Sequence, residues 1–344
     1  MATGFKSATV RAADVPATQT NFPAYVDLDR LGITTLAEAQ SVRVYADSAK
    51  TTEWAREIVS VTEMHVKVPS LTSTVSMFVD WDGVRSDYAV GATYGRNAVW
   101  SDYTDVIHFS TDPSTGSVLN STGGTNLTTA SFESGDLVAG KVGDALNIDS
   151  TADGLPRNTT TSFTSTFVMS WWLKPDLVQN YSMIMGAANG WGSFYAHTSS
   201  DSGSGTMYAG TSLVNRFVPA DTGAGVYVIG TWVKMDYRWV GGTGYLYKNG
   251  VQIASKAQST PAAWGGLVIS STDPNNAFDG LLDELRTVGA DRSANWITTE
   301  YNNQNAEATF WGTWADVSTA TTVTNIISIG NIVELNNISS IIGA

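Results

Sequence analysis

An Asn249-Gly250 pair in the second half of the chain constrains the fold more than any other local feature. It lies between two alternating runs, with Tyr245 and Tyr247 before it and Val251 after it. A type I′ β-turn needs positive φ at both central positions, and Asn-Gly meets this need at the least steric cost. The sequence therefore predicts a β-hairpin that turns at residues 249 and 250.

Strand-like runs recur along the whole chain at the spacing of an all-β protein. They are short, rich in aromatic and β-branched residues, and separated by Gly, Asn and Ser turn signals. Short helices are expected over residues 35–40 and 294–303. The pattern predicts an all-β fold of two β-sandwich-like domains. The clearest runs of the second half are residues 145–150, 167–175, 245–253 and 278–287.

Composition limits the class of protein. A chain of 344 residues suggests about two domains, and its 42% hydrophobic content is ample for their cores. Charged residues make up only 15%, so Ser, Thr, Asn and Gly cover much of the polar surface. The net charge of −13 and the lack of a basic run argue against binding to nucleic acid or to an anionic membrane surface. No run of about 20 apolar residues exists, so we expect no membrane insertion. The absence of cysteine excludes disulfides and thiolate-bound metals.

Shifts in composition divide the chain into five parts. Residues 1–21 are rich in Ala and Thr, and we expect an N-terminal arm. Residues 22–110 are expected to form a small β-rich domain. The Gly/Ser/Thr-rich residues 111–140 are interpreted as a linker or a long loop. A second sandwich follows over residues 141–317, and residues 318–344 form a C-terminal tail.

The C-terminal tail has an apolar residue at every third position, a period that fits neither a helix nor a strand. Two interpretations stay open. The tail packs on its own domain as an extended segment, or it buries these side chains against other subunits as an assembly tail. The positions are Ile326, Ile329, Ile332, Leu335, Ile338 and Ile341.

The second half of the chain resembles a known family. The four runs given above, with ANWITTEYNNQNAEATFW at 294–311, resemble the concanavalin A-like lectin/glucanase superfamily, most closely its laminin-G-like jelly-roll branch. Residues 22–110 resemble a domain of unknown function, the DUF2341 type, through TTEWAREI, HVKVPSLTSTVSMFVDWDG and NAVWSDYTDVIHFS. The resemblance implies a β-rich chain used in adhesion, sugar binding or surface assembly, without one fixed activity.

Glycosidases of this superfamily carry their carboxylates at alternate positions of one strand, facing one cleft. Asp283 and Glu284 are adjacent, so a regular strand would point them to opposite faces. Asp80 and Asp82 alternate, but they precede a turn whose geometry they are expected to serve. We therefore expect no enzyme activity, with glycoside hydrolysis the least favoured function.

One candidate metal site comes from spacing. Asp102, Asp105 and His108 would share a face of a helix, but the segment continues as a strand, which disfavours a site there.

The resemblance also implies a candidate structural Ca²⁺, which is the one cofactor that we expect. Several jelly rolls of the superfamily hold such an ion, and the match implies Asp283 as its side-chain ligand. Oxygens around Asn147 and Asp149 would complete the shell. In the alternative interpretation, Asp283 accepts hydrogen bonds from the backbone of a neighbouring strand.

Sugar binding needs exposed aromatic side chains. Trp191 in ANGWGSFY and Trp264 in PAAWGG stand among Gly, Asn and Ala, which indicates loops. They are the candidate carbohydrate-binding residues; the alternative is that they fill the edge of the sandwich.

These features favour a non-enzymatic virion protein, such as a bacteriophage decoration, fibre or tail-associated subunit. The N-terminus lacks the apolar core of a signal peptide, so we expect synthesis in the host cytoplasm and final location on the virion. Expected partners are other virion proteins or further copies of the chain, through the tail, and cell-surface glycans. The alternative is a carbohydrate-binding module of a cell-surface or secreted protein.

Overall fold

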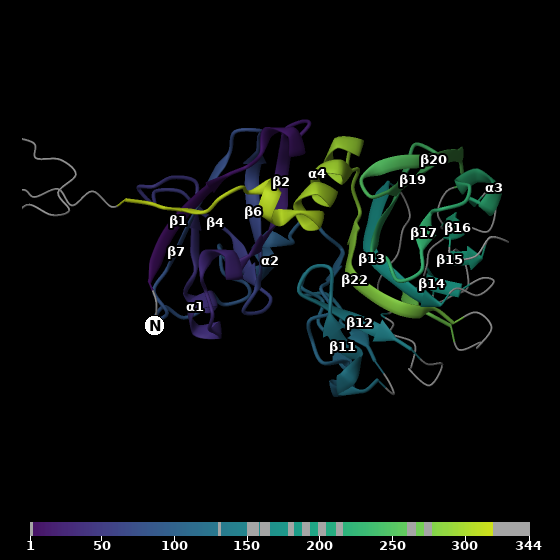
Figure 1. Cartoon of the computed structure of the whole chain (residues 1–344), viewed down its shortest axis with the longest axis horizontal. Coiled ribbons are helices and arrows are strands. Elements are labelled where there is room, and N and C mark those ends of the chain that lie inside the picture. Colours follow the sequence, from purple (N-terminus) through teal and green to yellow (C-terminus); the bar gives the residue numbers. More distant parts are fainter. Residues whose placement is uncertain are drawn as a thin grey trace, which may run out of the picture.

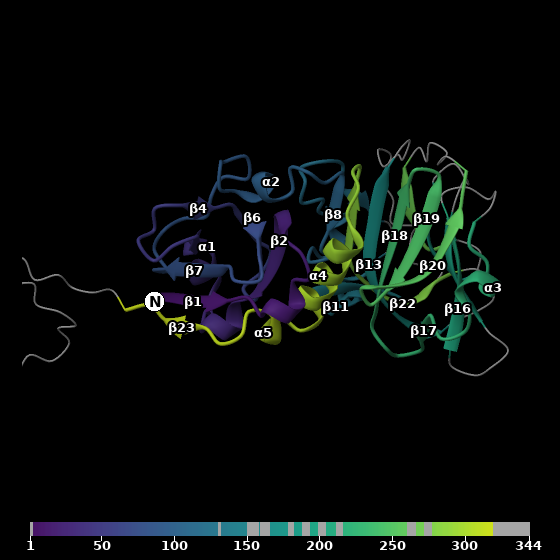
Figure 2. The same cartoon turned by 90° about the horizontal axis from the view of Figure 1, so that it is seen from above.

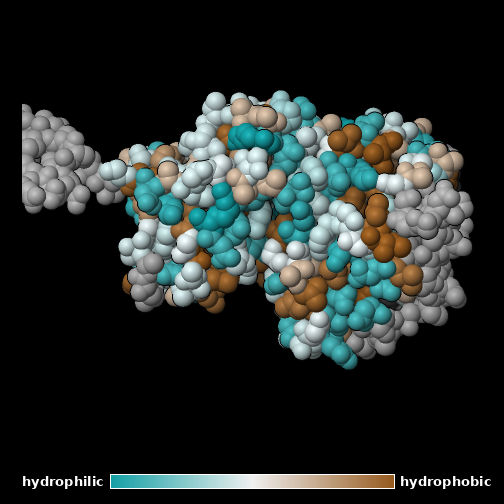
Figure 3. Space-filling view, viewed as in Figure 1, coloured by the Kyte–Doolittle hydropathy of each residue, from teal (hydrophilic) through white to brown (hydrophobic). Residues whose placement is uncertain are grey.

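The computed structural model describes residues 3–129, 132–149, 158, 166–177, 182–187, 193–198, 204–210, 216–259, 266–271 and 277–318. They form an all-β protein with a few short helices, arranged as two domains side by side (Figure 1). Within these ranges no helix is both long and apolar enough to cross a membrane. On the face seen in Figure 3, hydrophilic and neutral residues predominate and hydrophobic ones form separate groups.

The N-terminal domain contains a five-stranded sheet in the order β23-β1-β7-β3-β4. β1 pairs along its whole length with β7, from Gly4 opposite Trp81 to Thr9 opposite Ser76. The prediction of an arm over residues 1–21 is therefore wrong for its described residues, because main-chain pairing places them inside a sheet. The strands are β1 (Gly4–Thr9), β3 (Arg43–Tyr45), β4 (Glu53–Trp54), β7 (Ser76–Trp81) and β23 (Ala315–Asp316).

A three-stranded sheet, β2-β6-β5, completes this domain. Its strands are β2 (Gln19–Asp27), β5 (Arg56–Ile58) and β6 (Glu63–Leu71). Phe22, Val26 and Val66 are fully buried in the domain core. The helix predicted at 35–40 is confirmed as α1 (Leu36–Ser41), which begins with a capping box of Thr35 and Glu38. A second helix, α2 (Arg96–Val99), is a single turn.

The second domain is a jelly roll whose larger sheet runs in the order β11-β12-β22-β13-β18-β19-β20, with β8 also paired to β22. Since β8 precedes residue 110, the predicted domain boundary there is wrong. The strands are β8 (Asp105–Ile107), β11 (Leu137–Ala139), β12 (Asp144–Ile148), β13 (Phe167–Leu177), β18 (Val233–Val240), β19 (Thr243–Lys248), β20 (Val251–Ala257) and β22 (Asp279–Val288).

The hairpin predicted at Asn249-Gly250 is confirmed. β19 ends at Lys248 and β20 begins at Val251. The intervening residues have φ of 50° and 76°, as a type I′ turn requires.

The smaller sheet of the jelly roll has the order β17-β16-β15-β14-β21 and faces away from the N-terminal domain (Figures 1 and 2). Its strands are β14 (Ser182–Ala187), β15 (Ser193–Thr198), β16 (Ser204–Gly210), β17 (Tyr227–Val228) and β21 (Leu267–Ile269), and α3 (Pro219–Thr222) lies beside them. The core between the sheets combines Trp171 and Met235 of the larger sheet with Ile184 and Phe194 of the smaller one.

Residues 111–140 are part of the jelly roll. They contain the β9 (Ser117–Val118) and β10 (Leu127–Thr128) pair, and Val118, Leu127 and Phe132 are buried in the jelly-roll core. The interpretation as a linker is therefore wrong, because its apolar residues belong to that core.

The chain returns to the N-terminal domain after β22. The predicted helix at 294–303 is confirmed as α4 (Ala294–Asn305), which lies between the domains and is followed by α5 (Glu307–Phe310) (Figures 1 and 2). Trp296, Phe310 and Trp311 belong to the N-terminal core. The predicted end of the jelly roll at residue 317 is therefore wrong, and β23 completes the sheet in which the chain began.

Candidate functional site

A β-bulge in β22 shapes the surface where the two domains meet. Ser170 of β13 pairs with Arg286, but Trp172 pairs with Asp283, so β22 has one residue more than its partner. Glu284 lies at this bulge with a φ of 50°.

The bulge changes which way the two acidic residues point. Leu282 and Leu285 are both in the core between the sheets, so Asp283 and Glu284 between them both lie on the outer face. The expectation that they point to opposite faces is wrong, because the alternation of side chains breaks at a bulge.

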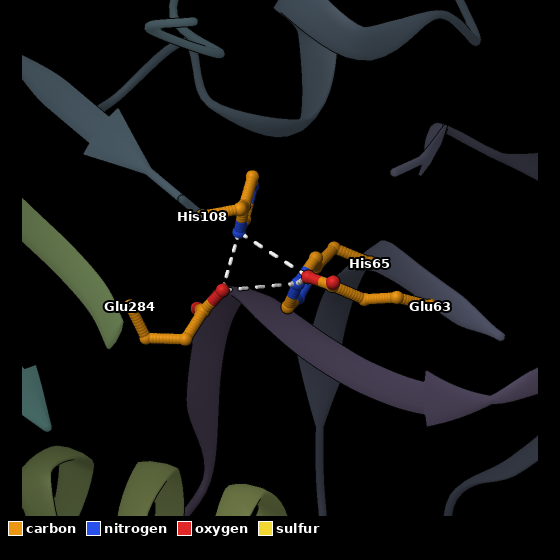
Figure 4. Close-up of side chains that lie close together, drawn as sticks. All are labelled: Glu63, His65, His108 and Glu284. Atoms are coloured by element: carbon orange, nitrogen blue, oxygen red, sulfur yellow. Dashed lines mark hydrogen bonds and ion pairs between the residues drawn. The ribbon is translucent and has the colours of Figure 1, made fainter. Parts of the chain in front are cut away.

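Glu284 joins three other side chains in a group that we call the junction cluster: Glu63, His65, His108 and Glu284 (Figure 4). Two come from β6 of the N-terminal domain, one directly follows β8, and one comes from β22. Alternation along β6 places Glu63 and His65 on the same face. Each of the four side chains is at most 2% exposed.

Four atoms of the junction cluster face a common point, and all lie within 4.8 Å of one another. His65 Nε2 is 2.9 Å from Glu63 Oε1 and 3.7 Å from Glu284 Oε1. His108 Nδ1 hydrogen-bonds to Glu284 Oε1 and lies 3.4 Å from Glu63 Oε1. The two imidazole rings stack with their centroids 4.6 Å apart.

Further buried groups hold the cluster in place from the N-terminal side. His108 Nε2 lies 3.3 Å from Glu57 Oε2. The same carboxylate accepts hydrogen bonds from Trp100 Nε1 and, at 2.7 Å, from Ser121 Oγ. Glu57 therefore fixes the orientation of the His108 ring.

On the jelly-roll side, a chain of ion pairs runs from the cluster to α4. Arg286 Nε donates to Glu284 Oε2 at 2.9 Å, and Arg286 Nη1 donates to Glu300 Oε1 at 2.9 Å. Lys234 Nζ donates to the other oxygen of Glu300 at 2.8 Å and also to Asp236. All of these side chains are buried.

Burial and mutual charge shift the pKa values of the cluster in opposite directions. Burial raises the pKa of the Glu63 carboxyl well above its usual range and lowers that of His65 well below it. Burial also disfavours the charged form of His108, but the carboxylates of Glu284 and Glu57 outweigh it and raise the His108 pKa. For Glu284, burial is outweighed by Arg286 and His108, which lower its pKa. The arrangement favours a charged His108–Glu284 pair.

A cavity of about 150 Å³ reaches the cluster from the side of β5. Its lining includes Glu57, His108 and Ser121, together with Arg56 and Arg96. Small ions and water could approach the His108 side of the cluster by this route.

Of the residues considered for calcium, Asp283 directly precedes Glu284 of the cluster, whereas Asn147 and Asp149 lie at the end of β12. Asp283 Oδ2 accepts hydrogen bonds of 2.8 Å from the backbone amides of both Lys141 and Val142, as in the alternative interpretation of this residue. Asn147 Nδ2 is 3.4 Å from Asp149 Oδ2 near the exposed end of β12. Calcium binding by these residues stays a prediction.

Other candidates from the sequence separate in the structure. Of the spacing-based trio, Asp102 is partly exposed, Asp105 bonds to Asn120 and Thr287, and His108 alone reaches the junction cluster. Trp191, Trp264 and the six apolar positions of the C-terminal tail, Ile326 to Ile341, lie outside the described residues.

Sequence reasoning missed the junction cluster as a group. The four residues are separated by up to 221 positions, and no local spacing connects them. The one local signal is Glu63-Met64-His65 in a predicted strand, which puts a carboxylate and an imidazole on one face.

Part of the second domain is similar to a known family. Residues 149–298 match the family model of the concanavalin A-like lectin/glucanase superfamily. The jelly roll is therefore of the concanavalin type, as the resemblance in the sequence implied. The matched range leaves out residues 22–110, whose resemblance to the domain of unknown function stays a prediction.

Solved structures with similar folds are distant in sequence. Domain 4 of AbnA, a GH43 extracellular arabinanase from Geobacillus stearothermophilus in complex with arabinotriose, is 18% identical, with a TM-score of 0.42 over 57% of this chain and 97% of that chain. A SAP-like pentraxin from Limulus polyphemus is 14% identical (TM-score 0.33; 41% and 72% of the two chains). The binding domain of Paraclostridial Mosquitocidal Protein 1 is 11% identical (TM-score 0.43; 59% and 52%). Among curated proteins, none matches the chain.

Proposed function

We propose that this chain is a non-catalytic adhesion or structural subunit of a virus particle, of the decoration, fibre or tail-associated kind. In this proposal the jelly roll binds glycans and the C-terminal tail attaches the subunit to the particle. The observation that carries it is the opposite placement of the two ends. β23, which leads to the tail, is an edge strand of the N-terminal domain, whereas the smaller jelly-roll sheet lies at the far side of the molecule (Figures 1 and 2).

The glycan-binding part rests on where the segments with the two candidate tryptophans join the smaller sheet. Gly186 of β14 pairs with Ser193 of β15 and with Val268 of β21. The C-terminal end of β14 and the N-terminal ends of β15 and β21 therefore lie side by side at the same end of the strands. The segment between β14 and β15 contains Trp191, and the one before β21 contains Trp264. In this proposal Trp191 and Trp264 together provide the aromatic side chains that bind the sugar.

The proposal that the protein is non-catalytic rests on the surroundings of the two carboxylates on β22. Asp283 and Glu284 are buried where the two domains meet. Asp283 Oδ2 accepts hydrogen bonds from backbone amides, and the Glu284 carboxylate contacts His108 and Arg286. Glycoside hydrolysis needs two carboxyl groups that flank a bound sugar in an open cleft. This pair is instead buried, and Glu284 contacts His65 of the N-terminal domain.

The attachment part rests on the place where the described chain ends. β23 pairs with β1, and the described chain ends at residue 318 beside the N-terminal sheet. An apolar segment that starts there can reach a neighbouring subunit without disturbing the jelly roll.

The first test is incorporation into particles. The intact chain should co-purify with virions, and a variant that ends at residue 318 should fold but fail to incorporate. Equal incorporation of both forms would contradict attachment through the tail. Absence of the intact chain from particles, with glycan binding retained, would favour a carbohydrate-binding module of a cell-surface or secreted protein.

The second test is a glycan array. Trp191→Ala and Trp264→Ala should each lose signal, whereas Tyr245→Ala, at a half-buried aromatic on β19, should keep it. Negligible signal from the intact chain would contradict the glycan-binding part.

A further inference from the structure

We infer that the junction cluster is a structural site for a divalent transition metal, best suited to Zn²⁺. Glu63 Oε1, His65 Nε2, His108 Nδ1 and Glu284 Oε1 would be its four ligands. This inference does not depend on the proposed glycan or virion function.

The distances between the four atoms fit a small coordination shell. A tetrahedral Zn²⁺ with bonds of about 2.0–2.1 Å separates its ligand atoms by about 3.3–3.5 Å. Three of the separations between candidate ligand atoms are 2.9, 3.4 and 3.7 Å, on either side of this range. His108 Nδ1 and Glu284 Oε1 lie closer together than this, and all four atoms lie within 4.8 Å of one another. Metal binding therefore requires side-chain shifts that open the His108–Glu284 contact and draw the four atoms around one ion.

The ligand types select the metal. Two imidazole nitrogens and two carboxylate oxygens suit Zn²⁺ and neighbouring transition metals, whereas Ca²⁺ and Mg²⁺ prefer shells made of oxygen.

The surroundings already supply partners for the ligands. A metal-bound histidine usually donates its other ring N–H to a carboxylate, and His108 Nε2 faces Glu57 Oε2 at 3.3 Å. Glu284 keeps its second oxygen on Arg286. His65 Nδ1 is 3.4 Å from Arg286 Nη2, and this contact must lengthen when His65 binds metal through Nε2, because Nδ1 then carries the proton.

One carboxylate oxygen of the cluster, Glu63 Oε2, is buried and has no hydrogen-bond partner among the described residues. It lies against Gly143, where a Cβ would overlap it and where φ is 59°, so a glycine is needed there.

The position of the site indicates a structural role. All four ligands are buried, so the shell has no open position for a substrate, as in structural zinc sites. The ligands come from β6, the end of β8 and β22, so an ion bound there would fasten the N-terminal domain to the larger sheet of the jelly roll.

The test uses the untagged full chain, stripped with a chelator and then titrated with Co²⁺ and Zn²⁺. We expect one equivalent of Co²⁺ to give the visible d–d bands of a tetrahedral nitrogen and oxygen shell. Zn²⁺ should displace it and raise the melting temperature. The inference would be overturned if the intact chain shows no d–d bands with Co²⁺ and no change in melting temperature with either metal. This outcome depends on the intact chain alone and not on the folding of a variant.

Matched variants locate the site. Glu284→Gln keeps the shape of a ligand and should weaken Co²⁺ binding at least tenfold. Asp236→Asn removes a buried carboxylate of the same junction that is no ligand, and it should bind Co²⁺ as the intact chain does. Equal binding by the intact chain and Glu284→Gln would place the metal elsewhere and overturn the assignment.

Discussion

Arg286 on β22 and Glu300 on α4 form a buried ion pair, with Nη1 and Oε1 2.9 Å apart. Lys234 of β18 donates to the second oxygen of Glu300 at 2.8 Å. The same helix places Trp296 in the N-terminal core. One carboxylate thus links two strands of the jelly roll to a helix that is anchored in the other domain.

Replacing Glu300 should destabilise the whole protein. Glu300→Gln leaves Lys234 and Arg286 buried with less compensating charge, and breaking such a pair costs about 3–5 kcal/mol. Denaturant unfolding measures the loss. Asp291→Asn is the control, because Asp291 pairs with Arg238 but is 42% exposed, and the loss there should be below about 1 kcal/mol. Similar losses for the two variants would refute a special role for Glu300.

The confirmed hairpin also contacts α4. Gly250 and Gly242 have φ of 76° and 80°, so alanine is strained at both positions, by roughly 1–2 kcal/mol. A Cβ at Gly250 would lie 3.0 Å from Tyr301 Cβ and 3.2 Å from Thr298 Cα, whereas one at Gly242 would meet nothing within 4 Å. Gly250→Ala should therefore lower the unfolding free energy more than Gly242→Ala. Equal losses in denaturant titrations would mean that the turn does not pack on the helix.

Glu307 should make stability depend on pH. Burial raises its pKa to about 7, despite the Arg30 side chain 2.5 Å away. A carboxyl whose pKa is higher in the folded state stabilises the fold at pH values below its unfolded pKa. That contribution is lost as the pH rises through about 7.

Glu307→Gln should remove this dependence. Between pH 4.5 and 7.5 the intact chain should lose at most about 3 kcal/mol relative to the variant. Thermal unfolding across this range compares the two proteins, and parallel pH profiles would be inconsistent with the raised pKa.

Calcium binding can be separated from the transition-metal site. If Asp283, Asn147 and Asp149 hold Ca²⁺, the ion should raise the melting temperature, and a chelator should reverse the rise. Asp149→Ala should abolish this rise in melting temperature. It should leave intact the hydrogen bonds that Asp283 accepts from the backbone amides of Lys141 and Val142. Asp316→Ala, at a side chain that is 86% exposed, serves as the control. An unchanged melting temperature in Ca²⁺ would argue against the site.

Local patterns in the sequence predicted the parts of the fold that local physics determines. The Asn249-Gly250 turn follows from φ preference, and α1 follows from the Thr35 start and good helix formers. The residues of β1 have no such pattern, because this strand is held by main-chain pairing with β7. The domain boundaries failed for a related reason: β8 and β23 each pair with the sheet of the other domain.

The junction cluster depends on information that no short segment contains. Glu63 and Glu284 are acidic residues that a sequence pattern assigns to the surface, and each is buried by the other domain. The bulge at Glu284 also breaks the alternation on which strand predictions depend. The spacing in the sequence groups His108 with Asp102 and Asp105, neither of which belongs to the cluster.

If the buried junction makes the two domains one cooperative unit, differential scanning calorimetry of the full chain should show a single unfolding transition. Its calorimetric and van't Hoff enthalpies should agree. Glu284→Gln should lower the transition temperature. Two separate transitions in the intact chain, with one unaffected by Glu284→Gln, would contradict a shared junction.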